Sequence, residues 1–306
     1  MNRSISFAAC AALALLSLGT TARAELIYGV TEAGNLVNFD SAAPATLNTV
    51  GALSGFVGGQ SFRGIDFRPA TGQLFALGSL GAGAQLYTVN LATAALTPVG
   101  SGFSLDSRNE ALSIDFNPAV DRLRIVAGDG NNYRANPNTG ALVLSDTDLT
   151  YNAGSGTGTP FINGIAYSNN VPGGTPTTLY GYDLNGNDLV TIGGVNGTSS
   201  PNGGLVFDVG NSNVAFTDSP LGFDISGTTG IGYINAEPAT SFRVSPDFYT
   251  VDLGTGALSF VGTFNENMLD ISAFAPAPLS VPEPGSIALL AGLGMTGMAA
   301  LRRRRK

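Results

Sequence analysis

The sequence predicts an all-β fold, a β-propeller of five blades with four strands each. Two patterns support this. One places a small or acidic residue between two apolar ones, and the other forms a hairpin of two alternating segments around a turn rich in Asn, Gly and Thr. The hairpins span residues 89–96, 135–142 and 251–258, and no amphipathic helix competes with them. The first pattern recurs about every 50 residues, a repeat that with four short strands is typical of a propeller blade, and its central residues are Asp66, Asp115, Ala166, Asp224 and Asp270.

Residues 1–24 have the layout of a secretory signal peptide. Arg3 precedes an apolar stretch at residues 5–18, and Ala22 and Ala24 flank Arg23. Cleavage after Ala24 would leave Glu25 as the first residue of the exported chain. A retained membrane anchor is the alternative, but the apolar stretch is shorter than the ~20 residues that span a bilayer.

Residues 25–275 are expected to form the propeller. Residues 26–53 supply three strands without an inner one, and residues 268–275 supply an inner strand without the other three. We expect the two chain ends to complete one blade together, which would cover two strand edges that otherwise invite aggregation. The fourth blade has the weakest pattern, because Ala166 replaces the acidic residue and a long Gly/Asn/Ser loop separates its outer strands. A solenoid or a β-sandwich remains the alternative.

The C-terminal segment has three parts. Residues 276–286 form a proline-rich linker that contains Pro282-Glu283-Pro284, residues 287–301 are apolar, and residues 302–306 are basic. The apolar part would rise only about 22 Å as a helix, less than the ~30 Å hydrocarbon core, so we expect it to stay in the inner membrane only transiently. The basic residues would remain cytoplasmic by the positive-inside rule, and four of them are Arg302, Arg303, Arg304 and Arg305.

This tripartite tail resembles that of PEP-CTERM proteins, which are substrates of a membrane transpeptidase called exosortase. The resemblance implies export through the inner membrane of a Gram-negative bacterium, processing by an exosortase-type enzyme, and a place at the cell surface or outside the cell. It also implies an association with the extracellular polysaccharide of biofilm matrix. A plain tail anchor that is never cut is the alternative.

The propeller segment resembles an uncharacterised family of secreted bacterial propeller-like domains. The resemblance rests on Ile-Asp-Phe elements at residues 65–67 and 114–116 and on a Leu-Tyr-Gly element at residues 179–181. It implies the fold and brings no known activity.

Composition excludes several function classes. The chain has no histidine, and its single cysteine, Cys10, lies in the signal peptide, so Ser-His-Asp and Cys-His sites and histidine-ligated zinc are excluded. Between residues 25 and 281 there are 7 arginines and 21 acidic residues, a net charge of −14. Such a surface repels phosphate backbones, so we expect no nucleic-acid partner.

The four acidic members of the repeated pattern, Asp66, Asp115, Asp224 and Asp270, are the candidate site residues. Inner propeller strands approach the central channel, where carboxylates that converge could hold Ca²⁺, which takes six to eight oxygen ligands. The alternative, which we favour, is that each Asp makes the same structural hydrogen bonds in its blade. We therefore expect no cofactor, no catalytic residue and a non-enzymatic propeller. A metal-dependent hydrolase or lyase that uses Asp or Glu carboxylates is the second hypothesis.

Overall fold

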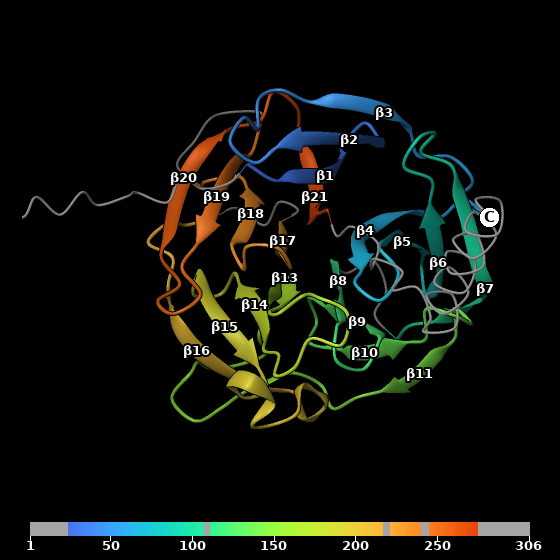
Figure 1. The fold of residues 1–306 in the computed structure, drawn as a ribbon. Coiled ribbons are helices and arrows are strands. Elements are labelled where there is room, and N and C mark those ends of the chain that lie inside the picture. Colours follow the sequence, from blue (N-terminus) through green and yellow to red (C-terminus); the bar gives the residue numbers. More distant parts are fainter. Residues whose placement is uncertain (1–23, 107–110, 217–220, 240–244, 275–306) are drawn as a thin grey trace, which may run out of the picture.

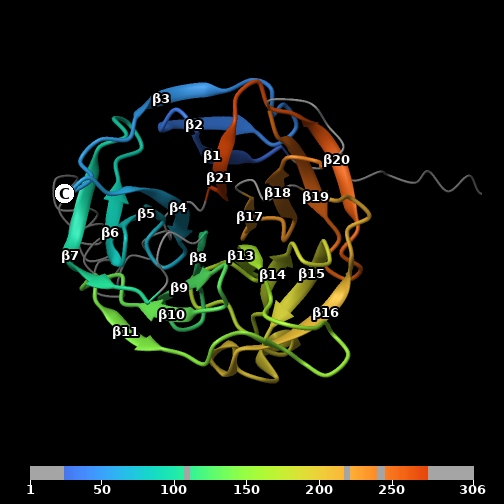
Figure 2. The ribbon, with the colours of Figure 1, turned by 180° about the vertical axis from the view of Figure 1, so that it is seen from behind.

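Five antiparallel sheets stand around a central axis in the computed structural model (Figure 1). The structure describes residues 24–106, 111–216, 221–239 and 245–274. The view from behind shows the same ring, with one strand of every sheet nearest the axis (Figure 2). The prediction of a five-bladed propeller is therefore confirmed, and the innermost strands are β4, β8, β13, β17 and β21.

Both chain ends build the first blade, as the sequence predicts. Strand β21 pairs antiparallel with β1, so that Ile27 faces Ala273 and Gly29 faces Ile271. The ring is closed by hydrogen bonds between segments that are more than 200 residues apart in the chain. From the axis outward, the blade consists of β21 (Met268–Ala273), β1 (Leu26–Thr31), β2 (Asn35–Asp40) and β3 (Asn48–Ala52).

Each of the other four blades is continuous in sequence from its inner strand to its outer one. The second is β4 (Ser61–Arg68), β5 (Gln73–Leu80), β6 (Gly83–Val89) and β7 (Leu96–Ser104), and the third is β8 (Leu112–Asn117), β9 (Arg122–Ala127), β10 (Asn132–Ala135) and β11 (Leu142–Ser145). The fourth contains β13 (Ile162–Tyr167), β14 (Leu179–Asp183), β15 (Asp188–Ile192) and β16 (Leu205–Asn211), and the fifth is β17 (Gly222–Ile225), β18 (Gly232–Ala236), β19 (Asp247–Val251) and β20 (Leu258–Thr263).

The fourth blade has a feature that the sequence did not predict. A short strand, β12 (Thr150–Tyr151), joins its outer edge in parallel with β16. The long Gly/Asn/Ser loop forms two 3-10 helices, η1 (Val195–Gly197) and η2 (Pro201–Gly203). The loop is fixed to the third blade, because Nη2 of Arg124 donates a hydrogen bond to Oδ1 of Asn202 at 2.6 Å.

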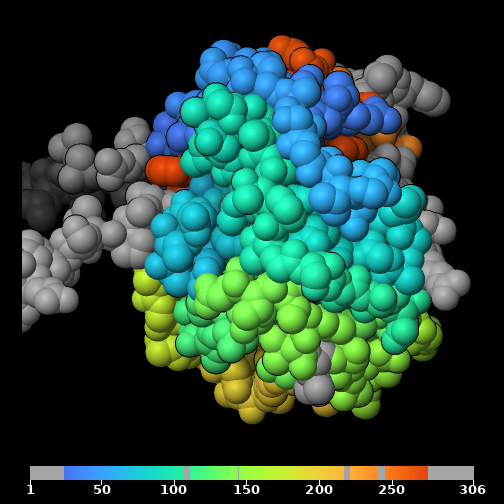
Figure 3. Space-filling view, turned by 90° about the vertical axis from the view of Figure 1, so that its right-hand side faces the viewer, coloured from blue at the N-terminus to red at the C-terminus, as the bar shows by residue number. Residues whose placement is uncertain are grey.

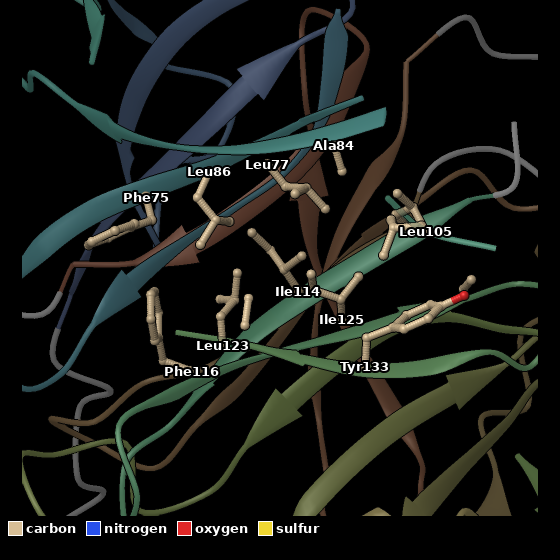
Figure 4. Packing of buried hydrophobic residues seen from close by; sticks show 13 residues of the cluster. Phe75, Leu77, Ala84, Leu86, Leu105, Ile114, Phe116, Leu123, Ile125 and Tyr133 are labelled. Carbon is tan, nitrogen blue, oxygen red and sulfur yellow. The ribbon is translucent and has the colours of Figure 1, made fainter. Parts of the chain in front are cut away.

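Apolar side chains fill the spaces between neighbouring blades. The described residues form five buried clusters, one for each of the five blade interfaces. Figure 4 shows the cluster between the second and third blades, where Phe75 and Phe116 meet edge to face with ring centroids 5.1 Å apart. The space-filling side view shows the early part of the chain on this side of the ring, with blue, teal and green segments next to one another (Figure 3). Burial decreases with distance from the axis: all residues of β13 are buried, whereas β3 has none.

Residues 24–274, as far as they are described, contain no helix that is long and apolar enough to cross a membrane. The apolar segment 287–301, which we predict to be a transient membrane helix, lies outside the described residues, as do the linker and the basic tail. That helix stays a prediction.

Candidate functional site

Three of the four candidate aspartates meet on the axis of the ring. Asp66 on β4, Asp115 on β8 and Asp224 on β17 are at most 2% exposed, and one carboxylate oxygen from each lies within 4.8 Å of the others. Each inner strand brings its aspartate to this level because the blades repeat around the axis. Oxygen atoms at such distances could share one hard cation.

Each of these aspartates joins its own blade to the next one. The N–H of Phe116 donates to Oδ2 of Asp66 at 2.7 Å, and the N–H of Tyr167 donates to Oδ1 of Asp115 at 3.0 Å. In both cases the donor is the residue that directly follows the equivalent position of the next inner strand. Asp224 makes the same contact with Ala273.

Ser272, rather than Asp270, takes the equivalent position in the first blade. It accepts the N–H of Phe67 at 3.2 Å, and it faces Tyr28 across the ladder, as Asp224 faces Tyr233. We call the five equivalent residues the ring layer, which consists of Asp66, Asp115, Ala166, Asp224 and Ser272.

Asp270 lies two residues earlier on its strand, at the level of Gly64 and Gly222. Its Oδ2 accepts the N–H of Ile65 at 2.8 Å, and its Oδ1 accepts that of its own neighbour Ile271 at 2.9 Å. The glycines provide the space: a Cβ atom at position 64 would lie 3.2 Å from Oδ2 of Asp270, and one at position 222 only 2.7 Å from Oδ1. The repeated sequence pattern equates Asp270 with Asp224, but in the structure the residue equivalent to Asp224 is Ser272, two positions later.

Burial dominates the electrostatics of the ring layer. It raises the pKa of Asp66 and Asp115 well above the ordinary value, and the negative charge of neighbouring aspartates adds to the effect. Burial is also the main reason why the pKa of Asp224 is raised to about 6. The oxygen Oγ of Ser272 lies 3.0 Å from a carboxylate oxygen of Asp66 and of Asp224. A single hydroxyl proton serves only one of these contacts, so the other requires a proton on a carboxyl group.

A cavity of about 230 Å³ opens above the ring layer, at the N-terminal ends of the inner strands. We call it the axial cavity. Polar and apolar atoms contribute almost equally to the surface of its walls. Its polar residues come from four different blades and were not singled out from the sequence, except Asp270; they are Arg63, Ser113, Asn163 and Asp270.

Two of these polar residues are placed by irregularities in the inner strands. The ladder register shifts between Phe62 and Gly64, and between Ile162 and Ile165. Such bulges redirect side chains and are frequent beside binding sites. Arg63 and Asn163 each stand three residues before the ring layer, where Leu112, Leu221 and Leu269 stand in the other blades. The cavity mouth therefore departs from fivefold repetition, and a periodic sequence pattern could not reveal it.

The predicted signal-cleavage site lies partly within the described residues. Ala24 is exposed, whereas the carboxylate of Glu25 accepts hydrogen bonds from Ser226, Thr229 and Tyr233 of the fifth blade at 2.6–2.9 Å. Burial, together with Glu25, raises the pKa of Tyr233 to about 12. Ala22 and the sorting residues Pro282, Glu283, Pro284 and 302–305 lie outside the described residues.

Comparison with known proteins adds two matches of family models. A model described as a domain of unknown function, DUF4394, matches residues 35–275, and a model of the PEP-CTERM protein-sorting motif matches residues 280–305. No curated protein matches the chain.

Solved structures resemble the chain only remotely. One is a protein of unknown function from Bacteroides thetaiotaomicron (16% identity, TM-score 0.48, 82% of this chain and 65% of that one). Others are a chain of a nidogen/laminin complex (10%, 0.47, 82% and 98%) and TolB from Acinetobacter baumannii (12%, 0.45, 78% and 53%). At these values the similarities carry no functional argument.

Proposed function

The chain belongs to the DUF4394 family, whose description gives no activity, and we propose that it is a non-enzymatic binding protein of the extracellular polysaccharide matrix. The PEP-CTERM motif indicates an exported protein that is sorted to the surface with exosortase-type processing. We further propose that signal peptidase cuts after Ala24, and that the exosortase-type enzyme acts near Pro282-Glu283-Pro284 after the tail has paused in the inner membrane. The mature propeller would then stay at the surface or be released.

The axial cavity is the observation that carries the binding role. Its walls combine apolar side chains with polar groups that converge from four different blades, as in many ligand sites. A volume of about 230 Å³ suits one sugar-sized unit. Because the buried ring layer closes the channel beneath the cavity, a long polysaccharide could enter only with a chain end or a side branch.

The ring layer supports a non-enzymatic role. A catalytic carboxylate would be expected in one asymmetric cluster that a substrate can reach. Asp66, Asp115 and Asp224 instead occupy equivalent places, are buried, and bind the backbone of the next blade. This arrangement favours the structural explanation of the repeated aspartates over a Ca²⁺ site, which stays a hypothesis.

A hydrolase or lyase is the second candidate, and one observation favours it. Asp270 is the only aspartate of the four that lines the axial cavity, and burial raises its pKa to about 8. A carboxyl group with such a pKa can act as a general acid at neutral pH.

Binding and turnover by the exported full chain distinguish the two candidates. We expect it to bind oligosaccharides of the producing cell's matrix without releasing shorter products. Asn163→Leu and Arg63→Leu should abolish binding, because they remove polar groups from the wall of the cavity. Leucine is compatible with the fold, since it stands at this position in three blades. Val143→Ser, on the exposed outer strand of the third blade, is the control and should bind normally. Release of reducing ends that Asp270→Asn abolishes would establish the enzyme instead.

A further inference from the structure

Asn235 presents a buried oxygen that lacks a donor. Its side chain lies on β18, is 0% exposed, and donates through Nδ2 to the carbonyl oxygen of Met268 at 3.1 Å. This bond fixes the orientation of the amide, so Oδ1 must be the free acceptor. Among the described residues, Oδ1 has no hydrogen-bond partner. A buried acceptor without a donor is costly, so its surroundings require an explanation.

The nearest explanation is the carboxyl group of Asp270. A Cβ atom on Gly222 would lie 2.3 Å from Oδ1 of Asn235 and 2.7 Å from Oδ1 of Asp270. The two oxygens are therefore at most about 5.0 Å apart. Two acceptors that face the same small space repel each other unless a proton or a cation lies between them.

Geometry favours a proton. Both oxygens of Asp270 already accept backbone N–H groups. A hard divalent cation requires six or more oxygen ligands, whereas one proton on Oδ1 gives Asn235 the single donor that it lacks. The space is available because position 222 is glycine.

The surroundings of Asp270 oppose its ionisation. The pKa of Asp270 is raised to about 8 by burial first, and the charge of Asp224 contributes. No ion pair with Asp270 occurs among the described residues. The titratable or charged groups on the elements around it are Tyr28 on β1, Arg63, Asp66 and Arg68 on β4, Asp115 on β8, Asp224 on β17 and Tyr233 on β18.

We propose that Asp270 is a neutral carboxylic acid that donates its proton to Oδ1 of Asn235, and that it thereby makes the floor of the axial cavity uncharged. The residue is thus a specificity determinant: the cavity accepts neutral hydroxyl or carbonyl groups of a ligand and rejects ammonium groups and metal cations. This second part rests on the proposed binding function, whereas the protonation of Asp270 does not.

Protonation gives stability a definite pH dependence. The pKa of Asp270 is higher in the folded chain than in the unfolded chain, so the folded state binds the proton more tightly. The stabilisation is complete below the pKa of the unfolded carboxyl, about 4, and is lost as the pH rises through about 8.

Thermal unfolding of the purified full-length chain tests the protonation. Asparagine keeps a donor toward Asn235 and cannot ionise, so we expect Asp270→Asn to match the natural chain at about pH 4, close to the pKa of the unfolded carboxyl, and to melt at an increasingly higher temperature than the natural chain as the pH rises to about 9. Asp270→Ala should melt lower than Asp270→Asn at both pH values, because it leaves Oδ1 of Asn235 without a donor. Equal melting temperatures of the Asn and Ala variants would contradict the proposal.

Infrared spectroscopy of the carboxyl groups gives a second readout. The natural chain should show a carboxylic-acid carbonyl band, and the part of it that decreases between about pH 6 and pH 9 should be missing in Asp270→Asn, since Asp66 and Asp115 also have raised pKa values and contribute to the band. A band that is the same in both chains would refute the neutral acid. An increase in melting temperature with CaCl₂ at about pH 6 that Asp270→Asn abolishes would show a cation in place of the proton, and would also overturn it.

Ligand binding separates this proposal from the proposed function. If matrix oligosaccharides do not bind but the infrared band is present, the binding function fails and the neutral Asp270 stands. If they bind and the band is absent, the binding function stands and the proposal of a neutral Asp270 fails.

Discussion

At the residue scale, one buried charge cluster lies apart from the axis. The side chain of Asp146 is 2% exposed, and its carboxylate accepts hydrogen bonds from Nη1 of Arg124 at 2.6 Å and from Nε and Nη2 of Arg134 at 2.7 Å each. Arg124 also bonds Asn132 and the Asn202 loop. One carboxylate therefore compensates two arginines and fixes the fourth-blade loop to the third blade.

Asp146→Asn should destabilise the protein by about 3 kcal/mol, because it leaves buried guanidinium groups without a counter-charge. Asp121→Asn is the matched control. Asp121 pairs with Arg68 but is 32% exposed, so its loss should cost about 1 kcal/mol or less. Urea unfolding of both variants measures the difference, and equal losses would show that burial does not determine the contribution of these pairs.

The residue scale is also where prediction from the sequence was least complete. The aspartates of blades two, three and five were found because they recur in an apolar frame. Asp270 fits that frame as well as Ser272 does, and only the ladder between β1 and β21 assigns Ser272 to the ring layer. Arg63, Ser113, Asn163 and Asn235 could not be found, since no repetition marks them and the bulges that place two of them depend on tertiary pairing.

At the element scale, the hairpin turns of several blades share one conformation. In six of the described turns the N–H of the fifth turn residue donates to the carbonyl of the first, among them Gly140 to Asn136, Gly230 to Ser226 and Gly256 to Asp252. These three glycines have positive φ angles of 66–77°. The repeated Asn/Gly/Thr pattern was readable from the sequence because this turn requires it.

Gly140→Ala should cost several kcal/mol, whereas Gly230→Ala should cost only about 1–2 kcal/mol for the left-handed conformation. A Cβ atom at position 140 would lie 1.8 Å from the carbonyl oxygen of Val99, while position 230 has nothing within 4 Å. Thermal unfolding of both variants tests this. The packing explanation fails if the two losses are alike.

The closing strand β21 was predicted from the unequal numbers of strands at the two chain ends, and the structure confirms it. A chain that ends at Asn267 lacks β21 and should lose its cooperative unfolding transition, because β1 and the inner faces of two neighbouring blades become exposed. A chain that ends at Val281 keeps β21 and should unfold like the full-length protein. Circular dichroism during urea titration compares the two. A cooperative transition with an unchanged midpoint in the shorter chain would mean that β21 does not hold the ring together.

At the scale of the whole molecule, the carboxylates on the axis are part of the closure of the ring. Three aspartates and Ser272 join successive inner strands through side chain to backbone hydrogen bonds, and only the step after Ala166 lacks one. The number of blades followed from the repeat, and the closure followed from the unequal numbers of strands at the two chain ends. Both are properties of the whole chain. The protonation of the axis and the shape of the cavity depend on distances between blades, which no local pattern contains.

Thermal unfolding of the full-length chain with millimolar Ca²⁺ and after EDTA treatment tests most directly whether the axial aspartates are structural. A cation that binds only the folded state at 100 times its dissociation constant would add about 2.7 kcal/mol to the free energy of unfolding. We predict the same cooperative transition at the same temperature in both buffers. A higher melting temperature with Ca²⁺ that is lost in EDTA, and that Asp115→Asn abolishes, would show that the aspartates hold a metal ion and would contradict this account.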